Sequence, residues 1–326
     1  MPKNTGFMSV FFLMRKPLKW VRLVSMEKFV QVETQIIDGN PIGARYREAV
    51  RQQALAFKEQ YGMAPGLGVV LVGDDPASAM YVRMKQRACE HAGLVSFSHV
   101  LPQTATHQEV QKAVDAMNDD PKIHGILVQL PMPKQVNEDE ILGCVRAEKD
   151  VDGFHPHNIG ALAMKGREPL FTPATPTGIM ILLEEMGVNL DGANAVVMGR
   201  SNIVGMPVAL LLMRANATVS LVHSRTRNPQ EMVKRADVLI AAIGKPNFVP
   251  GEWLKEGVFI VDVGTNKVDD PHSPNGYTYV GDVDLQGAMG VARAITKVPG
   301  GVGPMTITSL LMNTLKAAQR QMQAPA

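Results

Sequence analysis

Residues 67–89 have the sequence LGVVLVGDDPASAMYVRMKQRAC, and this stretch decides the fold of the region around it. The apolar run 67–72 predicts a buried strand, and Asp74-Asp75-Pro76 predicts a turn. Ser78 is a favourable N-cap, so the pattern predicts a helix that starts there and continues to Ala92. A strand, a turn and a helix in this order are the start of an α/β unit.

Tyr81 and Lys85 are four residues apart and therefore share one face of the predicted helix. The ring could stack on a flat heterocycle, and the amine could act as an acid or base if burial lowered its pKa. Taken alone, such a pair is more often a packed ring beside a solvated amine, because charged helix residues are mostly exposed.

Strand and helix patterns alternate in two series, on either side of a segment rich in Pro, Gly and His at residues 152–158. The first series predicts strands at 67–72, 97–101 and 125–130 and helices at 43–61, 78–92, 108–117 (capped by Thr106) and 137–144. The second predicts strands at 195–198, 218–222, 238–242 and 258–263 and helices at 175–186 (capped by Thr175), 205–215, 229–236 and 306–322. This alternation predicts an α/β protein of two domains, each a mostly parallel sheet with flanking helices. We expect the second domain to be Rossmann-like, with a cleft between the two.

Composition sets the outer limits of function. The 326 residues carry a net charge of +2, which implies no general affinity for nucleic acid or for an anionic membrane. Two cysteines, Cys89 and Cys144, are too few for a disulfide scaffold and fit a reducing, cytoplasmic compartment. The eight histidines have no metal-ligand spacing, so we expect no metal site. Residues 1–25 contain five basic residues and no acid, and we interpret them as a disordered extension or as the result of a start assigned too far upstream.

Gly199 and Gly205 lie where a predicted strand gives way to a helix, and glycine there lets a phosphate approach the backbone. Their spacing is not the usual Gly-x-Gly-x-x-Gly, so the signal alone is weak. The next strand is followed by His223-Ser224-Arg225, without the acid that binds the ribose hydroxyl of NAD. Arg200 and Arg225 flank the expected place of a ribose phosphate, which favours NADP. The alternative is that both arginines are simply solvated.

Gln129 and Asp152 complete the candidate site. Gln129 ends a predicted buried strand, and the carboxyl ends of parallel strands are where ligands bind. Its amide could orient the amine of Lys85 by hydrogen bonding, or it could be a satisfied buried amide. Asp152 lies in the loop between the domains, where a carboxylate could receive two donors from a ligand or could simply form a turn before Gly153.

From about residue 27 to the C-terminus the chain resembles the bifunctional methylenetetrahydrofolate dehydrogenase/cyclohydrolases. Five motifs in the order of that family carry the resemblance: YVRMKQRAC at 81–89, GILVQLPMP at 125–133, KDVDGF at 149–154, GRSNIVGMP at 199–207 and PGGVGPMT at 299–306. The resemblance implies oxidation of 5,10-methylenetetrahydrofolate with NADP, then hydrolysis of the methenyl product to 10-formyltetrahydrofolate. It also implies a homodimer that serves one-carbon metabolism, including purine biosynthesis.

The resemblance implies roles for particular residues. It implies catalytic roles for Tyr81, Lys85, Gln129 and Asp152, with Tyr81 and Asp152 also binding folate. It implies further substrate contacts at Pro299, Gly300 and Gly301. Cofactor contacts are implied at Gly199, Arg200, Ser201, Gly205, Ser224, Arg225 and Thr265, the last in a position that the family usually fills with isoleucine. By the same resemblance, a folate-binding catalytic domain comprises residues 26–153 plus 305–326, and an NADP-binding domain comprises 154–304.

Two other functions remain open at this point. An NADP-linked dehydrogenase of a small hydroxy or keto acid would explain residues 199–207 but would leave Tyr81, Gln129 and Asp152 without a task. A nucleotide-sensing or scaffolding protein without activity would require a decayed site, whereas the four candidate catalytic positions are intact. Turnover of methylenetetrahydrofolate against a panel of small acids distinguishes these possibilities.

Overall fold

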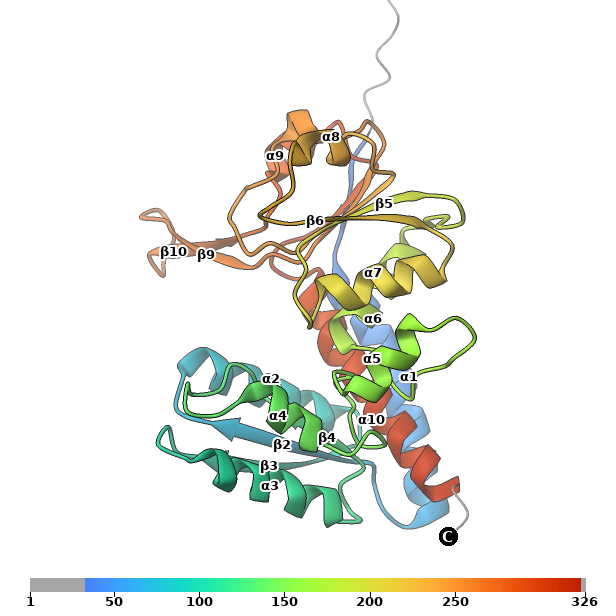
Figure 1. The fold of residues 1–326 in the computed structure, drawn as a ribbon, viewed down its shortest axis with the longest axis vertical. Coiled ribbons are helices and arrows are strands. Elements are labelled where there is room, and N and C mark those ends of the chain that lie inside the picture. The colour runs from blue at the N-terminus through green and yellow to red at the C-terminus, as the bar shows by residue number, and fades with distance from the viewer. Residues whose placement is uncertain (1–32, 324–326) are drawn as a thin grey trace, which may run out of the picture. The chain divides into compact units, whose positions relative to one another are not determined.

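The computed structural model describes residues 33–323, and Figure 1 shows how their helices and strands are arranged. The predicted extension, residues 1–25, lies outside this range. The strands form a three-stranded sheet, a six-stranded sheet and a separate two-stranded pair. Both larger sheets are parallel throughout and carry helices on both faces, which confirms the predicted two-domain α/β class.

The smaller sheet has the strand order β3-β2-β4. Its strands are β2 (Gly66–Val72), β3 (Val95–Leu101) and β4 (Gly125–Val128). Every residue of β2 is buried, as expected for the central strand of a parallel sheet, and its Val and Leu side chains favour the extended backbone. All three strands were predicted, with ends that differ by at most two residues.

Alternate side chains of β2 enter two separate cores. Leu67, Val69 and Leu71 pack with α2 (Pro76–His91), together with the long helices α1 (Gly39–Tyr61) and α10 (Val302–Gln323). Val70 and Val72 pack on the other face with α3 (His107–Asp119) and α4 (Glu138–Cys144). The period of two along the strand thus places α2 on one face of the sheet and α3 on the other.

Two helix starts in this domain test the capping predictions. Thr106 caps α3 as predicted, in a capping box with Glu109. The predicted cap at Ser78 is wrong, because α2 begins two residues earlier, at Pro76. Asp75 is the N-cap, and its carboxylate accepts from the Ser78 backbone N–H at 2.7 Å. Proline is favourable in the first helical turn and places Ser78 inside the helix.

The larger sheet has the order β1-β11-β8-β7-β5-β6. Its strands are β1 (Gln35–Ile37), β5 (Asn194–Met198), β6 (Thr218–Val222), β7 (Val238–Ala241), β8 (Phe259–Asp262) and β11 (Ala294–Thr296). The four strands predicted for this domain are all present. The two three-residue strands, β1 and β11, were not predicted, because so short a run carries no recognisable period.

Helices cover both faces of the larger sheet in Figure 1, namely α6 (Ala174–Glu185) and α7 (Gly205–Arg214) on one face and α8 (Pro229–Val233) and α9 (Leu285–Ala288) on the other. The predicted cap of α6 at Thr175 is wrong, because the helix already starts at Ala174 after an extended Pro173. The Thr175 hydroxyl instead pairs with the hydroxyl of Thr306 at 3.0 Å.

The long helices α1 and α10 pack against each other, and α10 also packs against α6. Helix α10 starts at Val302, four residues before the predicted start. Strand β1, directly before α1, pairs with β11 in the larger sheet. The chain therefore crosses between the two sheets near its start as well as near its end, and the domain limits given above stay a prediction. Within residues 33–323 no helix is both long and apolar enough to span a bilayer.

Five further elements among residues 33–323 were not predicted. They are the helices α5 (Pro156–Ala163) and α9, the short 3-10 helix η1 (Gly251–Trp253), and the antiparallel strands β9 (Asn266–Asp269) and β10 (Tyr277–Val280). Helix α5 begins inside the Pro- and His-rich segment that the sequence presents as a joint. In the sequence, β9 and β10 lie between β8 and α9. The loop after β8 therefore leads directly into strand β9.

Candidate active site

Lys85 and Gln129 are brought together from two neighbouring elements. Lys85 lies on α2, and Gln129 is the first residue after β4, where its backbone N–H still bonds to Val70 of β2. The Lys85 Nζ donates to the Gln129 Oε1 at 3.0 Å, as predicted. The amide nitrogen of Gln129 donates to the carbonyl of Leu130 at 2.6 Å, which fixes the oxygen toward the lysine.

The surroundings of Lys85 weaken its hold on a proton. The side chain is partly buried, and burial lowers the pKa of its amine, against the opposing effects of Asp152 and Cys89. Cys89 is itself fully buried, and burial raises the pKa of its thiol to about 12, so that it stays protonated. A lysine with a lowered pKa gives up its proton more readily, which favours a role as an acid–base group.

Asp152 lies close enough to Lys85 for each charge to shift the pKa of the other group. Burial raises the pKa of Asp152 to about 6, the amine of Lys85 opposes this shift, and the charge of Asp150 adds to it. Near pH 7 the carboxylate is therefore mostly ionised, with two oxygens that can accept hydrogen bonds.

The loop that carries Asp152 is built around its neighbour Asp150. The buried carboxylate of Asp150 accepts from the backbone N–H groups of Gly153, Phe154 and His155 at 3.1, 3.1 and 2.8 Å. It also accepts from the side-chain amide of Asn158 at 2.7 Å. These four hydrogen bonds hold the backbone of residues 150–155 around the Asp150 carboxylate, and they leave the loop that carries Asp152 little conformational freedom. Asp150 and Asn158 were not singled out by the sequence.

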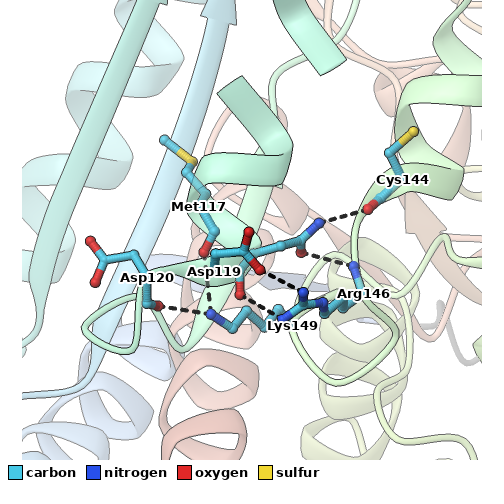
Figure 2. Close-up of polar contacts among 7 residues, drawn as sticks. Met117, Asp119, Asp120, Cys144, Arg146 and Lys149 are labelled. Carbon is cyan, nitrogen blue, oxygen red and sulfur yellow. Dashed lines mark hydrogen bonds and ion pairs between the residues drawn. The ribbon is translucent and has the colours of Figure 1, made fainter. Parts of the chain in front are cut away.

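Lys149 anchors the same loop from its other side (Figure 2). Only 7% of Lys149 is exposed, and its Nζ donates to the carbonyls of Met117 and Asp120 at 3.2 and 2.9 Å, at the end of α3. Arg146 pairs nearby with Asp119 at 2.6 Å. Cations are favourable at the C-terminal end of a helix, so these residues tie the start of the loop to α3.

Helix α10 holds the middle of the loop. The side-chain amide of Asn313 donates to the carbonyl of Val151 at 2.8 Å and to that of Thr172 at 3.0 Å. Gly153 has a φ of +76°, and a Cβ there would lie 2.6 Å from the backbone nitrogen of Pro173. Glycine is therefore required directly after Asp152, both by the backbone conformation and by the close approach of the next segment.

Tyr81 presents its ring to the surroundings from α2, with 44% of the residue exposed. It shares a helix face with Lys85, as the four-residue spacing predicts. The turn Pro299-Gly300-Gly301 lies at the start of α10 and packs against the start of α1, where Gly39 donates its N–H to the carbonyl of Gly300 at 2.9 Å. Within residues 33–323 no hydrogen bond joins this turn to Lys85, Gln129 or Asp152.

Gly199 and Gly205 form a tight connection between β5 and α7. Gly199 has a φ of +120°, and a Cβ there would lie 2.1 Å from the carbonyl oxygen of Ala242. A Cβ on Gly205 would lie 2.2 Å from the carbonyl oxygen of Gly199. The Ser201 hydroxyl accepts from the backbone N–H groups of Val204 and Gly205 at 3.2 and 3.4 Å. Both glycines are therefore required by the close packing of the chain against itself, in a connection that leads into a helix start, where phosphates commonly bind.

The remaining predicted cofactor residues follow the carboxyl ends of strands in the larger sheet, and we call this row of strand ends the cofactor edge. Arg200 follows β5, Ser224 and Arg225 follow β6, and Thr265 follows β8, so all lie beyond the carboxyl ends of parallel strands. All four are exposed. The backbone N–H of Arg225 donates to the Nδ1 of His223 at 3.1 Å, which shapes the turn without engaging the guanidinium.

Two buried aspartates behind this edge, Asp262 and Asp282, were not found from the sequence. The motif Gly281-Asp282-Val283 gives a weak signal, because glycine beside an acid often marks a turn. A cavity of about 250 Å³ lies at the opposite, amino-terminal end of β7 and β8, beside Asp237 and Lys255. None of the predicted site residues lines that cavity.

The fold defines a two-domain α/β protein with a Rossmann-like sheet, and comparison with known proteins identifies its family. The model "Tetrahydrofolate dehydrogenase/cyclohydrolase, catalytic domain" matches residues 37–152, and the model for the NAD(P)-binding domain of the same family matches residues 173–322. The chain belongs to the tetrahydrofolate dehydrogenase/cyclohydrolase family. The resemblance drawn from the five sequence motifs is thereby confirmed.

Individual relatives agree with this assignment. The chain is 53% identical over 285 residues to "Bifunctional protein FolD 4, chloroplastic" of Arabidopsis thaliana, covering 87% of this chain and 79% of the relative. It is also 53% identical over 285 residues to "Bifunctional protein FolD 2" of Geobacter metallireducens, covering 87% and 97%.

Solved structures give the same result. The methylenetetrahydrofolate dehydrogenase-cyclohydrolase of Trypanosoma brucei, complexed with NADP cofactor and inhibitor, superposes with a TM-score of 0.86 at 38% identity, covering 90% of this chain and 99% of that one. The FolD enzyme of Campylobacter jejuni superposes with a TM-score of 0.83 at 41% identity, covering 88% and 99%.

Proposed function

We propose that the protein oxidises 5,10-methylenetetrahydrofolate to the 5,10-methenyl form with NADP and then hydrolyses this product to 10-formyltetrahydrofolate. Membership of the family supports both reactions. The observation that carries the second reaction is the bond of 3.0 Å between the Lys85 amine and Gln129, in surroundings that lower the pKa of the amine. A small-acid dehydrogenase would have no use for this pair.

The residues between β5 and α7 fit NADP. The connection from β5 leads into the start of α7, and a helix start is where the pyrophosphate would bind. Arg200 and Arg225 are exposed beyond β5 and β6 and would hold the phosphate on the ribose, while Ser201, Ser224 and Thr265 would line the site. When bound, NADP supplies the acceptor for a hydride from the methylene bridge of the folate. The chain contributes mainly by aligning the two rings.

In the hydrolysis, Lys85 and Gln129 would move the protons. Water adds to the methenyl carbon and loses a proton, the bond from that carbon to N5 breaks, and N5 gains a proton. The Lys85 amine would accept the first proton and return one to N5, while Gln129 holds the amine in position. A positioned acid–base group of this kind typically contributes about 10²–10⁴-fold.

Folate itself would be held by Tyr81 and Asp152. The exposed ring of Tyr81 offers a face on which the pterin could stack. The two oxygens of Asp152 match the amino group and ring N–H that a pterin presents side by side. Pro299, Gly300 and Gly301 would contact the substrate where α10 begins.

A spectroscopic assay that follows NADPH and methenyltetrahydrofolate together tests this function. We expect NADPH to form with methylenetetrahydrofolate and NADP, and we expect added methenyltetrahydrofolate to be hydrolysed without NADP. A panel of small hydroxy and keto acids serves as the control and should give no NADPH. Turnover of an acid in the panel, or folate binding without turnover, would contradict the proposal.

We also propose a cytoplasmic homodimer whose product feeds one-carbon metabolism, including purine biosynthesis. Two unpaired cysteines, Cys89 and Cys144, support a reducing compartment. The names of two Arabidopsis thaliana relatives specify the chloroplast and the mitochondrion, so an organelle is the competing outcome. Sedimentation measures the oligomeric state, and cell fractionation measures the location. A monomer at micromolar concentration, or an organellar signal, would overturn the respective part.

A further inference from the structure

Two buried carboxylates, those of Asp262 and Asp282, lie near each other behind the strand ends that carry the predicted cofactor residues. Asp262 ends β8 and is 3% exposed, and Asp282 follows β10 and is fully buried. Burial raises the pKa of Asp262 to about 7, its backbone donors oppose the shift, and the charge of Asp282 adds to it. Among the ion pairs of residues 33–323, none includes either carboxylate. Both carboxylates are therefore held by N–H donors rather than by a cation.

Those donors come from the loops at the cofactor edge. Asp282 accepts from three successive backbone N–H groups after β7, those of Ile243, Gly244 and Lys245, the last two at 2.9 Å. It also accepts from the side-chain amide of Asn266, after β8, at 2.9 Å. One carboxylate thus joins the loop after β7 to the loop after β8. Three converging N–H groups make an anion site that a side chain of the same protein fills.

Asp262 completes the arrangement from the other side. Its carboxylate accepts from the backbone N–H groups of Gly264, Asp282 and Val283 at 2.9, 2.9 and 2.8 Å. Thr265 therefore lies between two anchored residues, Gly264 and Asn266, and is itself exposed at the cofactor edge. A Cβ on Gly264 would lie 2.3 Å from the Asp282 carboxylate, so the loop packs directly against it.

The loop after β7 also contacts the phosphate-binding turn. A Cβ on Gly199 would lie 2.1 Å from the carbonyl oxygen of Ala242, immediately before the residues that Asp282 holds. In the strand order β8-β7-β5-β6, Arg225 lies beyond β6 on one side of that turn, and the two anchored loops lie on the other side. If Arg225 is beside the ribose phosphate, the anchored loops are beside the nicotinamide half of NADP.

We propose that Asp282, backed by Asp262, is a positioning residue that holds residues 243–245 and 264–266 in the shape that binds the nicotinamide half of NADP. This inference rests on the proposed use of NADP. Two buried carboxylates without a cationic partner contribute little to the stability of a fold, because burying a charge costs free energy even when the charge is hydrogen-bonded. The donors to these carboxylates come largely from the two loops that would border the cofactor. Such a free-energy cost is typical of functional sites.

The variant Asp282→Asn tests the proposal, because it keeps the shape but sets an amide N–H₂ against at least one N–H donor. We expect the KM for NADP to rise about 10-fold while the KM for methylenetetrahydrofolate changes less than about 2-fold. Hydrolysis of methenyltetrahydrofolate without NADP should stay near the parent rate. The matched control is Asp284→Asn, which alters a carboxylate that only caps α9, through the N–H of Gln286. It should leave the KM for NADP unchanged.

A second variant covers the case in which Asp282→Asn does not fold. Asn266→Ala keeps both carboxylates and removes only the amide that links Asp282 to the loop after β8. We expect the dissociation constant for NADP to be about 3-fold larger, as measured by titration calorimetry, which needs no turnover. Unchanged NADP affinity in a folded Asp282→Asn, or in Asn266→Ala if the former is insoluble, would overturn the proposal. An equal loss of both activities would do the same, whereas an inactive parent that still binds NADP would contradict only the proposed function.

Discussion

The two candidate regions of this protein are built in different ways. Around Lys85, the side chains of Lys85, Gln129 and Asp152 are partly buried and interact with one another. The neighbouring loop is anchored from three directions, by Asp150, Lys149 and Asn313. Around Gly199, the candidate side chains are exposed, while the buried carboxylates behind them bond mainly to backbone N–H groups. Only the first region shifts the pKa of the groups that would react.

This difference corresponds to two different tasks. A proton relay needs an amine whose pKa lies near the working pH, and burial is the means of lowering it. A site for a charged cofactor needs free donors in a fixed arrangement, so its arginines stay exposed until the cofactor arrives. Damage to the first region should therefore appear in rates of hydrolysis, and damage to the second should appear in the KM for NADP.

The largest expected effect comes from Lys85→Met, which keeps the length of the side chain and removes the amine. We expect hydrolysis of methenyltetrahydrofolate to fall by about 10²–10⁴-fold, with part of the dehydrogenase activity surviving. The control is Arg87→Met, which removes an exposed cation on the same helix. Hydrolysis at the parent rate in Lys85→Met would rule out this lysine as the relay.

Asp152→Asn should reduce folate binding by about 10–100-fold, because an amide N–H₂ would oppose a pterin donor in a partly desolvated site. Both reactions should slow, while the KM for NADP stays nearly constant. Steady-state kinetics with each substrate varied in turn measures the two effects. If the variant loses thermal stability but keeps its KM for folate, Asp152 is a structural turn residue.

The pH dependence of folate binding should reveal the same carboxylate. Because burial raises the pKa of Asp152 to about 6, lowering the pH below that value protonates it and removes one acceptor. We expect the KM for folate to rise about 10-fold one pH unit below this pKa. Burial raises the pKa of Asp150 to about 6 as well, so only the part of the pH dependence that Asp152→Asn removes measures Asp152.

The raised pKa of Asp152 also determines how the free energy of unfolding depends on pH. The folded-state pKa of Asp152 lies above the ordinary value of 3.8, so its ionisation is less favourable in the folded chain. This contribution to the free energy of unfolding is complete below about pH 4 and is lost as the pH rises through about 6. Urea unfolding of the parent and of Asp152→Asn across this range measures the difference, and parallel curves would contradict it.

The smallest effect is expected at the exposed cofactor edge. Arg200→Ala should raise the KM for NADP about 5-fold and should leave that for NAD almost unchanged, because a charge-assisted bond to the ribose phosphate is lost with only one of them. Comparable losses with both cofactors would place Arg200 at the pyrophosphate or in the fold.

Much of this fold could be predicted from periodicity. The central strands are continuous apolar runs and the helices between them are amphipathic, so their identity was clear and only their ends shifted. The errors have local causes: Asp75 and Pro76 start α2 before Ser78, and Pro173 starts α6 before Thr175. Strands as short as β1 and β11 depend on their partners in the sheet and leave no pattern of their own.

The site divides in the same way. Lys85 and Gln129 could be paired from the sequence because a strand end and a helix face are local features, and their bond is present. The anchors Asp150, Asp262 and Asp282 could not be found, because their partners are backbone N–H groups supplied by loops whose course the sequence does not reveal. A backbone donor has no residue type and therefore leaves no motif.

The most direct test of the division between the two regions is the rate of methenyltetrahydrofolate hydrolysis, measured without NADP, in Lys85→Met and in Arg200→Ala. If the regions have separate tasks, Lys85→Met should lose hydrolysis by about 10²-fold or more, and Arg200→Ala should match the parent. Equal losses in the two variants, or a loss confined to Arg200→Ala, would contradict the account.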